Sequence, residues 1–293
     1  MVTDREYGSA ASVPAGIVSP MAAGTGADST PEPLLRTGRG APLLLLHGVL
    51  LTWQSWTPVL GDLRADHDVL APTLPGHHGG PAADHPATVA GLADWAEALL
   101  DETGWPTAHI VGNSLGGWIA LELAARGRAR TVTAISPAGL WSGPSSAQAL
   151  VRKFRGMSPL IGFGSDTPPV LPGMIRSLLL PLLAHHPGTV APQLARAMAA
   201  APAHCTILDD LAEDPALPTG FTGLPDLTVP ATVLLPEFDR VLPPRLYPEL
   251  TSTPVLTVRP LPGLGHVPML EDPTRITAEI RATIARETAL RSA

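Results

Sequence analysis

The pentapeptide Gly112-Asn113-Ser114-Leu115-Gly116 joins a short apolar stretch, residues 109–111, to a segment of helical character that ends near Arg126. A G-x-S-x-G pattern between a strand and a helix is typical of a sharp turn that exposes its serine. The positions two before and two after the serine must be small, as Gly112 and Gly116 are, and the helix start directs free N–H groups at the reacting group. Ser114 is therefore a candidate nucleophile; the alternative is a glycine-rich turn with a capping serine.

Apolar strands and helices alternate on both sides of this turn. The expected strands are 42–46, 68–71, 109–111, 132–135, 231–235 and 254–258, and the expected helices are 53–63, 88–102, 115–126 and 273–290. Short, uninterrupted apolar runs are typical of strands that are buried on both faces. The alternation therefore predicts an α/β fold, a mostly parallel sheet with helices on both faces.

This alternation stops between residues 139 and 228, where apolar helical pieces are divided by prolines and no strand pattern occurs. The gap is too long for an ordinary loop, so we expect a helical cap or lid at 139–228 inserted into a core formed by 34–138 and 229–293. Residues 1–33 are rich in Ala, Gly, Ser, Thr and Pro, which predicts a disordered N-terminal tail.

The composition excludes several classes of protein. The 293 residues are 45% hydrophobic and 15% charged, with a net charge of −7 and no basic block, which argues against a nucleic-acid partner. The sequence contains no run of 18 consecutive apolar residues, so no transmembrane helix is expected. The start of the chain lacks the pattern of a secretory signal. We expect a cytoplasmic protein that acts on a small molecule and contacts no membrane; the oligomeric state stays open.

Metal and cofactor sites are not expected. Cys205 is the only cysteine, so an intramolecular disulfide and a cysteine-rich zinc site are excluded, and a structural thiol is the simpler interpretation. His77, His78 and His85 share one loop, but no carboxylate pattern completes a metal site there.

Two further polar side chains follow later strands. His266 lies on a glycine-flanked loop after strand 254–258, and Asp239 follows strand 231–235. A carboxylate that orients an imidazole and stabilises its cation makes that imidazole a general base for a serine. Glu237 competes with Asp239 for this role, and a surface histidine with a solvated acid is the alternative to a site.

With Ser, Asp and His in this order, each after a different strand, the chain resembles the α/β-hydrolase superfamily with a helical cap, over roughly residues 35–290. The motifs are Leu46-His47-Gly48-Val49, the elbow at 112–116, the acid loop Asp239 to Pro243, and the closing signature Gly263 to Pro273, which reads G-x-G-H-x-P-x-x-E-x-P. Pro236 departs from the glycine usual before the acid, and the family's N-terminal hairpin is abbreviated or lies in the tail.

The resemblance implies a mechanism. His266 takes the proton of Ser114 as the serine attacks a carbonyl carbon, and Asp239 holds the imidazole. The backbone N–H groups of Val49 and Leu115 form the oxyanion hole. The supporting residues are His47, Gly48, Gly112, Asn113 and Gly116.

The identity of the residue at the elbow excludes some enzyme classes of this superfamily. Haloalkane dehalogenases and epoxide hydrolases of this superfamily carry Asp at the elbow, where this chain has Ser114. Asn113-Ser114 with Gly116-Gly117 resembles carbon–carbon hydrolases and many small esterases, but those carbon–carbon hydrolases usually follow the catalytic His with Trp, not with Val267. We therefore expect a serine esterase that cleaves a small or medium, largely apolar ester. A carbon–carbon hydrolase and a non-hydrolytic or ligand-binding member of the fold are the alternatives.

Other side chains have weaker interpretations. Trp118 at helical spacing with Ile119 and Leu123 is expected in the core. Trp53 and Trp56 either line the pocket or pack the first helix. We interpret Arg152-Lys153-Arg155 as a solvated face. A site for acyl groups that end in a carboxylate would need cations in the pocket, so an apolar cap predicts poor activity on such substrates.

Overall fold

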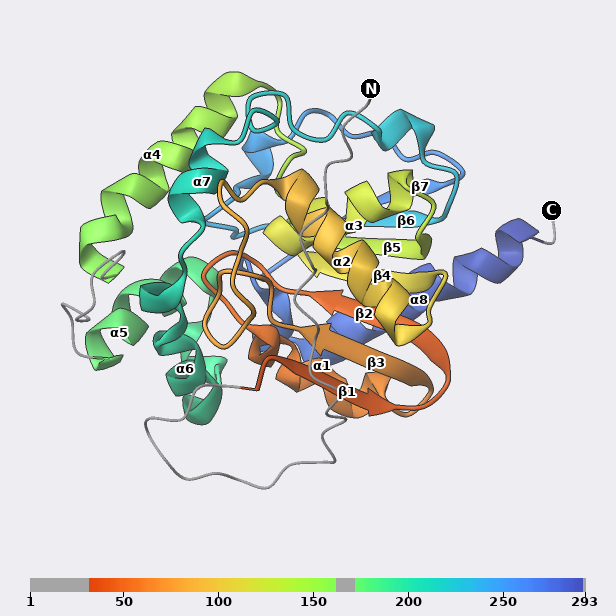
Figure 1. Ribbon diagram of the computed structural model, residues 1–293, viewed down its shortest axis with the longest axis horizontal. Coiled ribbons are helices and arrows are strands. Elements are labelled where there is room, and N and C mark those ends of the chain that lie inside the picture. The colour runs from red at the N-terminus through yellow and green to blue at the C-terminus, as the bar shows by residue number, and fades with distance from the viewer. Residues whose placement is uncertain (1–31, 162–171, 292–293) are drawn as a thin grey trace, which may run out of the picture.

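The computed structural model describes residues 32–161 and 172–291; the expected disordered tail lies outside them, apart from residues 32 and 33. A seven-stranded sheet in the order β1-β3-β2-β4-β5-β6-β7 forms the centre of the molecule (Figure 1). The strands are β1 Leu34–Gly38, β2 Ala41–Leu46, β3 His67–Pro72, β4 Ala108–Asn113, β5 Ala129–Ile135, β6 Ala231–Pro236 and β7 Leu256–Leu261. Six strands run parallel, which confirms the predicted α/β class.

Among the strands of the described residues, β1 alone is antiparallel; it pairs with β3, and it was not among the expected strands. It is short and half-buried, so its apolar pattern is weak. An ion pair between Arg36 and Asp68, with 2.7 Å between Nη2 and Oδ2, joins the two strands at this edge. Strand β7, at the other edge, begins two residues and ends three residues later than expected, because an edge strand tolerates Pro260, which cannot donate a ladder hydrogen bond.

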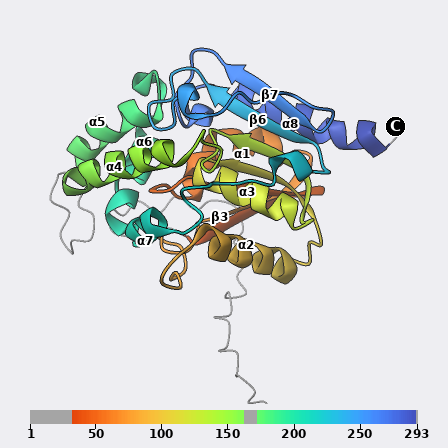
Figure 2. The ribbon, with the colours of Figure 1, turned by 90° about the horizontal axis from the view of Figure 1, so that it is seen from above.

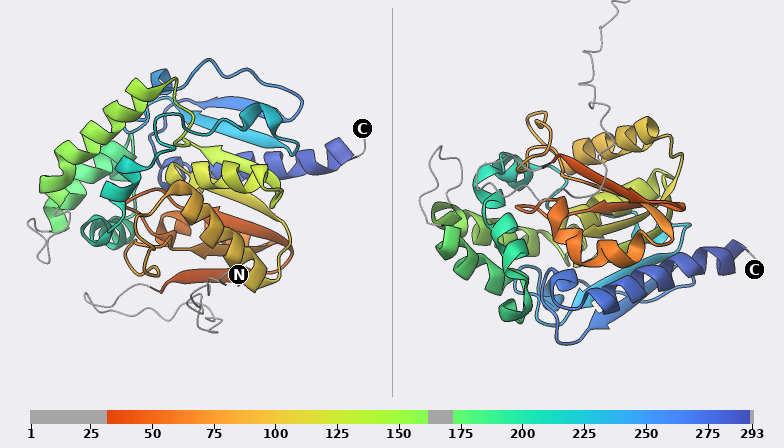
Figure 3. Two further views of the ribbon diagram at one scale, coloured as in Figure 1. Left: turned by 45° about the horizontal axis from the view of Figure 1, so that its top comes forward. Right: turned by 90° about the horizontal axis from the view of Figure 1, so that it is seen from below.

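Four helices cover the sheet: α1 Thr57–Leu63, α2 Val89–Thr103, α3 Leu115–Ala125 and α8 Pro273–Arg291. Helices α1 and α8 lie together on one face, and α2 and α3 lie on the other (Figure 3). The four leucines at 43–46 alternate between these faces: Leu43 and Leu45 join the core under α1 and α8, and Leu44 and Leu46 join the core under α2 and α3. This two-sided burial explains the uninterrupted apolar run.

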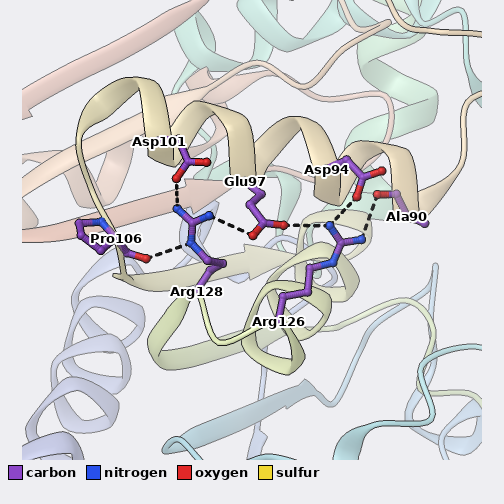
Figure 4. A network of polar contacts seen from close by, with 7 residues as sticks. All are labelled: Ala90, Asp94, Glu97, Asp101, Pro106, Arg126 and Arg128. Atoms are coloured by element: carbon purple, nitrogen blue, oxygen red, sulfur yellow. Dashed lines mark hydrogen bonds and ion pairs between the residues drawn. The ribbon is translucent and has the colours of Figure 1, made fainter. Parts of the chain in front are cut away.

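Helix α2 begins and ends as its sequence predicts. The Thr88 side chain accepts a hydrogen bond from the Gly91 N–H, and Gly104 closes the helix in the left-handed conformation at φ +77°. Ion pairs from Arg126 and Arg128 to carboxylates of α2 tie this helix to the end of α3 (Figure 4); the carboxylates are those of Asp94, Glu97 and Asp101.

A buried polar cluster lies where α8 crosses the amino ends of β4 and β5. Arg130 donates from Nε and Nη2 to the two carboxylate oxygens of Glu287, both at 3.0 Å. Nε2 of His109 lies 3.6 Å from Glu287, and Nδ1 of His109 lies 2.9 Å from the Thr131 hydroxyl. Burial, followed by the charge of Arg130, lowers the pKa of His109 to about 4.

Four longer helices, here called the inserted helices, lie between β5 and β6 and gather at one end of the sheet (Figures 1 and 2). They are α4 Pro144–Ile161, α5 Pro172–Leu183, α6 Pro192–Ala199 and α7 Leu208–Glu213. The described part of this stretch contains no strand, as expected. No helix in the described part of the chain is both long enough and apolar enough to cross a membrane.

Candidate active site

Ser114 occupies a strained turn between β4 and α3. Its φ is +55° and its ψ is −115°, a backbone conformation that residues other than glycine rarely adopt. The two flanking glycines are required by contact. A Cβ at Gly112 would lie 2.0 Å from the carbonyl oxygen of Gly116, and a Cβ at Gly116 would lie 2.1 Å from the carbonyl oxygen of Leu46. The elbow is thus packed directly against the end of β2.

The loop after β2 brings Gly48 beside the serine. A Cβ at Gly48 would lie 3.1 Å from the Ser114 Cβ, so the loop backbone approaches the turn closely. A hydrogen bond from the Leu51 N–H to the Gly48 carbonyl, at 3.2 Å, closes a tight turn with Leu50 at φ +66°. Val49 lies inside this turn. Leu115 is the first residue of α3, where N–H groups have no acceptor within the helix.

His47 fixes the peptide that carries the Val49 N–H. Its Nε2 accepts the Leu74 N–H at 2.9 Å, so its Nδ1 carries the proton and donates to the Gly48 carbonyl at 2.8 Å. Burial, and then the neighbouring His77, hold the pKa of His47 well below its usual value, which keeps this tautomer neutral. In a trans peptide the carbonyl and the next N–H point in opposite directions, so this bond turns the Val49 N–H away from His47.

His266 and Asp239 meet in the buried loops after β7 and β6. The imidazole Nδ1 lies 2.7 Å from Oδ2 of Asp239, and both residues are buried. The other carboxylate oxygen accepts the N–H groups of Val241, at 2.8 Å, and Leu242, at 2.7 Å. Burial alone would raise the pKa of Asp239, but the imidazole and these N–H groups lower it below its usual value. The carboxylate is therefore ionised next to the imidazole.

Glu237, the competing acid, is engaged elsewhere. Its Oε2 accepts the Gly263 N–H at 3.0 Å, which ties the two loops together at the surface. Pro236 is the last residue of β6, and its carbonyl accepts the Asp239 N–H at 3.4 Å. The proline in place of the usual glycine therefore leaves Asp239 in contact with His266.

Asn113 links the elbow to the histidine loop. Its Nδ2 donates to the carbonyl of His266 at 3.0 Å and to the carbonyl of Ile135 at 3.2 Å. The residue before Ser114 thus holds the backbone of His266, although the two lie 153 positions apart. The carboxyl ends of β4 and β7 are joined by this side chain.

Two cavities lie between the strand ends and the inserted helices. One is lined by Ser114 and Leu115 with Trp118, Trp141 and Leu211. The other is lined by His266 with leucines of α5 and with Met198 of α6. Val49, Phe154 and Val241 line both cavities, so the turn with the Val49 N–H lies where the two meet.

Several side chains differ from their sequence interpretation. Trp118 is buried as expected but also lines the Ser114 cavity. Arg152 and Arg155 are exposed, as expected of a solvated face, and Arg155 pairs with Glu213 at 3.5 Å while it also borders the Ser114 cavity. Lys153 differs, because it is half-buried and donates to the Arg240 carbonyl beside Asp239. The sequence missed the Lys153 contact because it depends on how α4 packs against the loop after β6. Trp56 is fully buried in the core against α1, with Trp53 packed beside it.

The loop that carries His77, His78 and His85 packs against α7 and the segment before it. The rings of His78 and His204 stack with centroids 4.3 Å apart, and His85 Nδ1 lies 2.5 Å from Asp210. Within the described residues, no group of three or more His, Cys, Asp or Glu side chains is arranged to hold a metal ion. Cys205 is buried beside His77.

Comparisons with known proteins agree with this architecture. Residues 43–280 match the model of the alpha/beta hydrolase family. The chain is 41% identical over 202 residues to "Epoxide hydrolase EphH" of Mycobacterium tuberculosis, covering 66% of this chain and 93% of that protein. It is 34% identical over 110 residues to the 2-hydroxymuconate semialdehyde hydrolase of Pseudomonas sp. strain CF600, covering 36% of this chain and 39% of the relative.

Solved structures share the fold at low sequence identity. A thermophilic esterase from Thermogutta terrifontis superposes with a TM-score of 0.67 at 24% identity, covering 87% of this chain and 93% of the esterase. The enol-lactonase from Burkholderia xenovorans LB400 superposes with a TM-score of 0.67 at 20% identity, covering 86% of this chain and 95% of the lactonase.

Proposed function

The chain belongs to the alpha/beta hydrolase family, and we propose that it is a serine hydrolase that cleaves a small or medium, largely apolar ester. One observation carries the proposal. A serine in a strained turn lines one cavity, an imidazole lines the adjoining cavity, and that imidazole is bonded through Nδ1 to a buried, ionised carboxylate. A serine, an imidazole and a carboxylate in these relations activate a hydroxyl for attack on a carbonyl carbon.

In the proposed reaction the Ser114 oxygen bonds to the carbonyl carbon and its proton passes to Nε2 of His266. The carbonyl oxygen becomes an oxyanion that accepts the N–H groups of Val49 and Leu115; each such donor contributes roughly 3–4 kcal/mol to transition-state stabilisation. The carbon–oxygen bond to the leaving group breaks, and His266 gives its proton to that oxygen. Water then attacks the acyl-enzyme with His266 as base, which releases the acid and restores Ser114.

The two cavities suggest where each half of the ester binds. The acyl carbon bonds to Ser114, so the acyl group occupies the cavity of Trp118, Trp141 and Leu211. The leaving oxygen receives its proton from His266, so the alcohol half occupies the cavity lined by α5 leucines and Met198. Both walls are mainly apolar, and we propose that the inserted helices cap them and exclude water.

Epoxide hydrolysis is a second candidate because a relative with 41% identity bears that name. Ser114 argues against the covalent route, since attack by a hydroxyl on an epoxide carbon leaves an ether. An ether offers water no carbonyl carbon to attack, whereas a carboxylate nucleophile forms an ester that water can cleave. Carbon–carbon hydrolysis is a third candidate, favoured by Asn113-Ser114 and by the name of the 34% identical relative.

A panel of esters, lactones, vinylogous diketones and epoxides, assayed with wild type beside Ser114→Ala, tests the proposal. We expect ester turnover to fall by about 10⁶ in the variant, by analogy with a serine protease. A fluorophosphonate probe should label the wild type at Ser114 and leave the variant unlabelled. Ester hydrolysis by Ser114→Ala at the wild-type rate, or turnover of epoxides alone, would contradict the proposal.

Two cavity-filling variants test the placement of the substrate halves. Leu211→Phe should shorten the longest acyl chain accepted in a series of methyl esters, and Met198→Phe should shorten the longest alcohol accepted in a series of acetates. Each buried methylene contributes roughly 0.8 kcal/mol, so the lost carbons should appear in kcat/KM. Each variant is the other's control. If Leu211→Phe shortened the alcohol and Met198→Phe shortened the acyl chain, the two halves of the ester would be assigned to the opposite cavities.

A further inference from the structure

Glu271, the acid of the closing signature, lies five residues after His266 and takes no part in the reaction proposed above. Its side chain is half-buried and both carboxylate oxygens accept backbone N–H groups. Oε2 accepts the Gly265 N–H at 2.8 Å, and Oε1 accepts the His186 N–H at 2.7 Å. A carboxylate that accepts two N–H groups makes two charge-assisted hydrogen bonds, which are stronger than neutral ones.

The two donors belong to different parts of the molecule. Gly265 immediately precedes His266 on the loop after β7, whereas His186 follows α5 among the inserted helices. One carboxylate therefore ties the imidazole loop to the inserted helices. The contact is close, because a Cβ at Gly265 would lie 2.5 Å from the backbone nitrogen of His185.

The backbone of His266 is held at three consecutive residues. Before it, the Gly265 N–H binds Glu271; at His266 itself, the carbonyl accepts Nδ2 of Asn113 at 3.0 Å. After it, the Val267 N–H donates to the Leu183 carbonyl at the end of α5, at 2.8 Å. Two of these three bonds lead to the segment 183–186, so the position of the imidazole depends on how that segment is seated.

We infer that Glu271 is a positioning residue for His266, which couples the seating of the inserted helices to the placement of the imidazole between Asp239 and Ser114. The inference rests on the proposed function for its effect on catalysis. Glu271→Gln is the informative change, because an amide offers one oxygen where the carboxylate offers two and turns an NH₂ group toward one N–H. The remaining packing is preserved.

Asp272 supplies a matched control. It is the adjacent carboxylate and is also half-buried, but it accepts the Arg275 N–H, at 3.0 Å, at the start of α8. Asp272→Asn keeps an oxygen that can accept this N–H and removes only the charge at the start of the helix, so it should change stability little and leave His266 in place. Both variants are compared at a temperature well below their melting transitions.

The kinetic test compares p-nitrophenyl esters with alkyl esters of the same acid. A p-nitrophenolate leaves without a proton, whereas an alkoxide needs the proton of His266. Glu271→Gln should lower kcat/KM, which reports acylation, about 10- to 100-fold on alkyl esters and less on p-nitrophenyl esters, as expected for a small misplacement of a catalytic group. An equal loss on both series, or an equal loss in Asp272→Asn, would overturn the inference.

A spectroscopic test stands apart from ester hydrolysis. The proton between His266 Nδ1 and Asp239 should give a downfield proton NMR signal that Asp239→Asn removes. Glu271→Gln should shift or broaden this signal, and Asp272→Asn should leave it in place. A signal unchanged by Glu271→Gln overturns the inference even if esters are cleaved, whereas a changed signal in a protein that cleaves no ester supports the inference and contradicts the proposed function.

Discussion

Two buried histidine–carboxylate contacts lie at opposite ends of the same sheet. At the carboxyl ends of the strands, His266 Nδ1 lies 2.7 Å from Asp239, whose second oxygen accepts two neutral N–H groups. At the amino ends, His109 Nε2 lies 3.6 Å from Glu287, whose two oxygens are both taken by Arg130. The residue types are alike, but among the described residues Asp239 has no cationic side chain as a hydrogen-bond partner apart from the imidazole, whereas Glu287 is paired with Arg130.

The difference explains why only one pair suits a general base. Asp239 leaves its negative charge available to a cation on His266, because its other partners are uncharged N–H groups. Burial disfavours the cation on His109, and Arg130, which already neutralises Glu287, disfavours it further, so the pKa of His109 falls to about 4. The remaining nitrogen also differs: His109 Nδ1 lies against the Thr131 hydroxyl, whereas His266 lines a cavity.

Removing the charge of Asp239 should have the largest effect. Asp239→Asn should lower ester turnover by about 10⁴, because an amide favours the wrong imidazole tautomer. Glu237→Gln is the matched control and should cost little, since Glu237 binds the Gly263 N–H and not the imidazole. Steady-state kinetics on one ester measure both variants; a larger loss in Glu237→Gln would transfer the role to that residue.

Removing the carboxylate charge of Glu287, at the amino ends of the strands, should lower stability and leave activity unchanged. Glu287→Gln leaves Arg130 without its carboxylate partner in a largely buried site, so the free energy of unfolding should fall by about 3 kcal/mol, discounted for the partial exposure of Arg130. Urea denaturation measures the loss, and kcat at low temperature should equal that of wild type. A drop in kcat to the level of Asp239→Asn would mean that the two pairs are not independent.

The titration of His109 should give the smallest effect. Its pKa is about 4 in the folded protein and roughly 6.5 in the unfolded chain. Between these values the unfolded chain binds the proton and the folded protein does not, so stability falls as the pH is lowered. From about pH 7 to about pH 5 this group should cost about 2 kcal/mol. Urea denaturation of His109→Gln over the same range should lose that much less than wild type; parallel curves would assign the loss to other groups.

The sequence predicted the centre of the molecule better than its margins. The leucine run of β2, the Thr88 and Gly104 caps of α2 and the elbow around Ser114 are local patterns, set by burial and by backbone geometry within a few residues. Strand β1 and the end of β7 were not predicted, because edge strands bury less and tolerate proline.

The contacts between distant segments needed the structure. No spacing in the sequence brings Asn113 to the carbonyl of His266, or Lys153 to that of Arg240, because these contacts depend on how loops and inserted helices pack. Trp118 was expected only in the core, since helical spacing does not tell which end of a buried side chain borders a cavity. The roles of Ser114, Asp239 and His266 stay predictions until the variants are measured.

The meeting of two cavities at Val49 gives the proposed site a handedness. A planar ester held with one half on each side, and with its oxygen toward one backbone N–H, offers only one of its two faces to Ser114. When the carbon next to the carbonyl is a stereocentre, we expect the two enantiomers to place its larger substituent differently against the wall of the Ser114 cavity. A racemic ester of that kind is then resolved rather than consumed, and its optical rotation would report on the shape of the cavity wall.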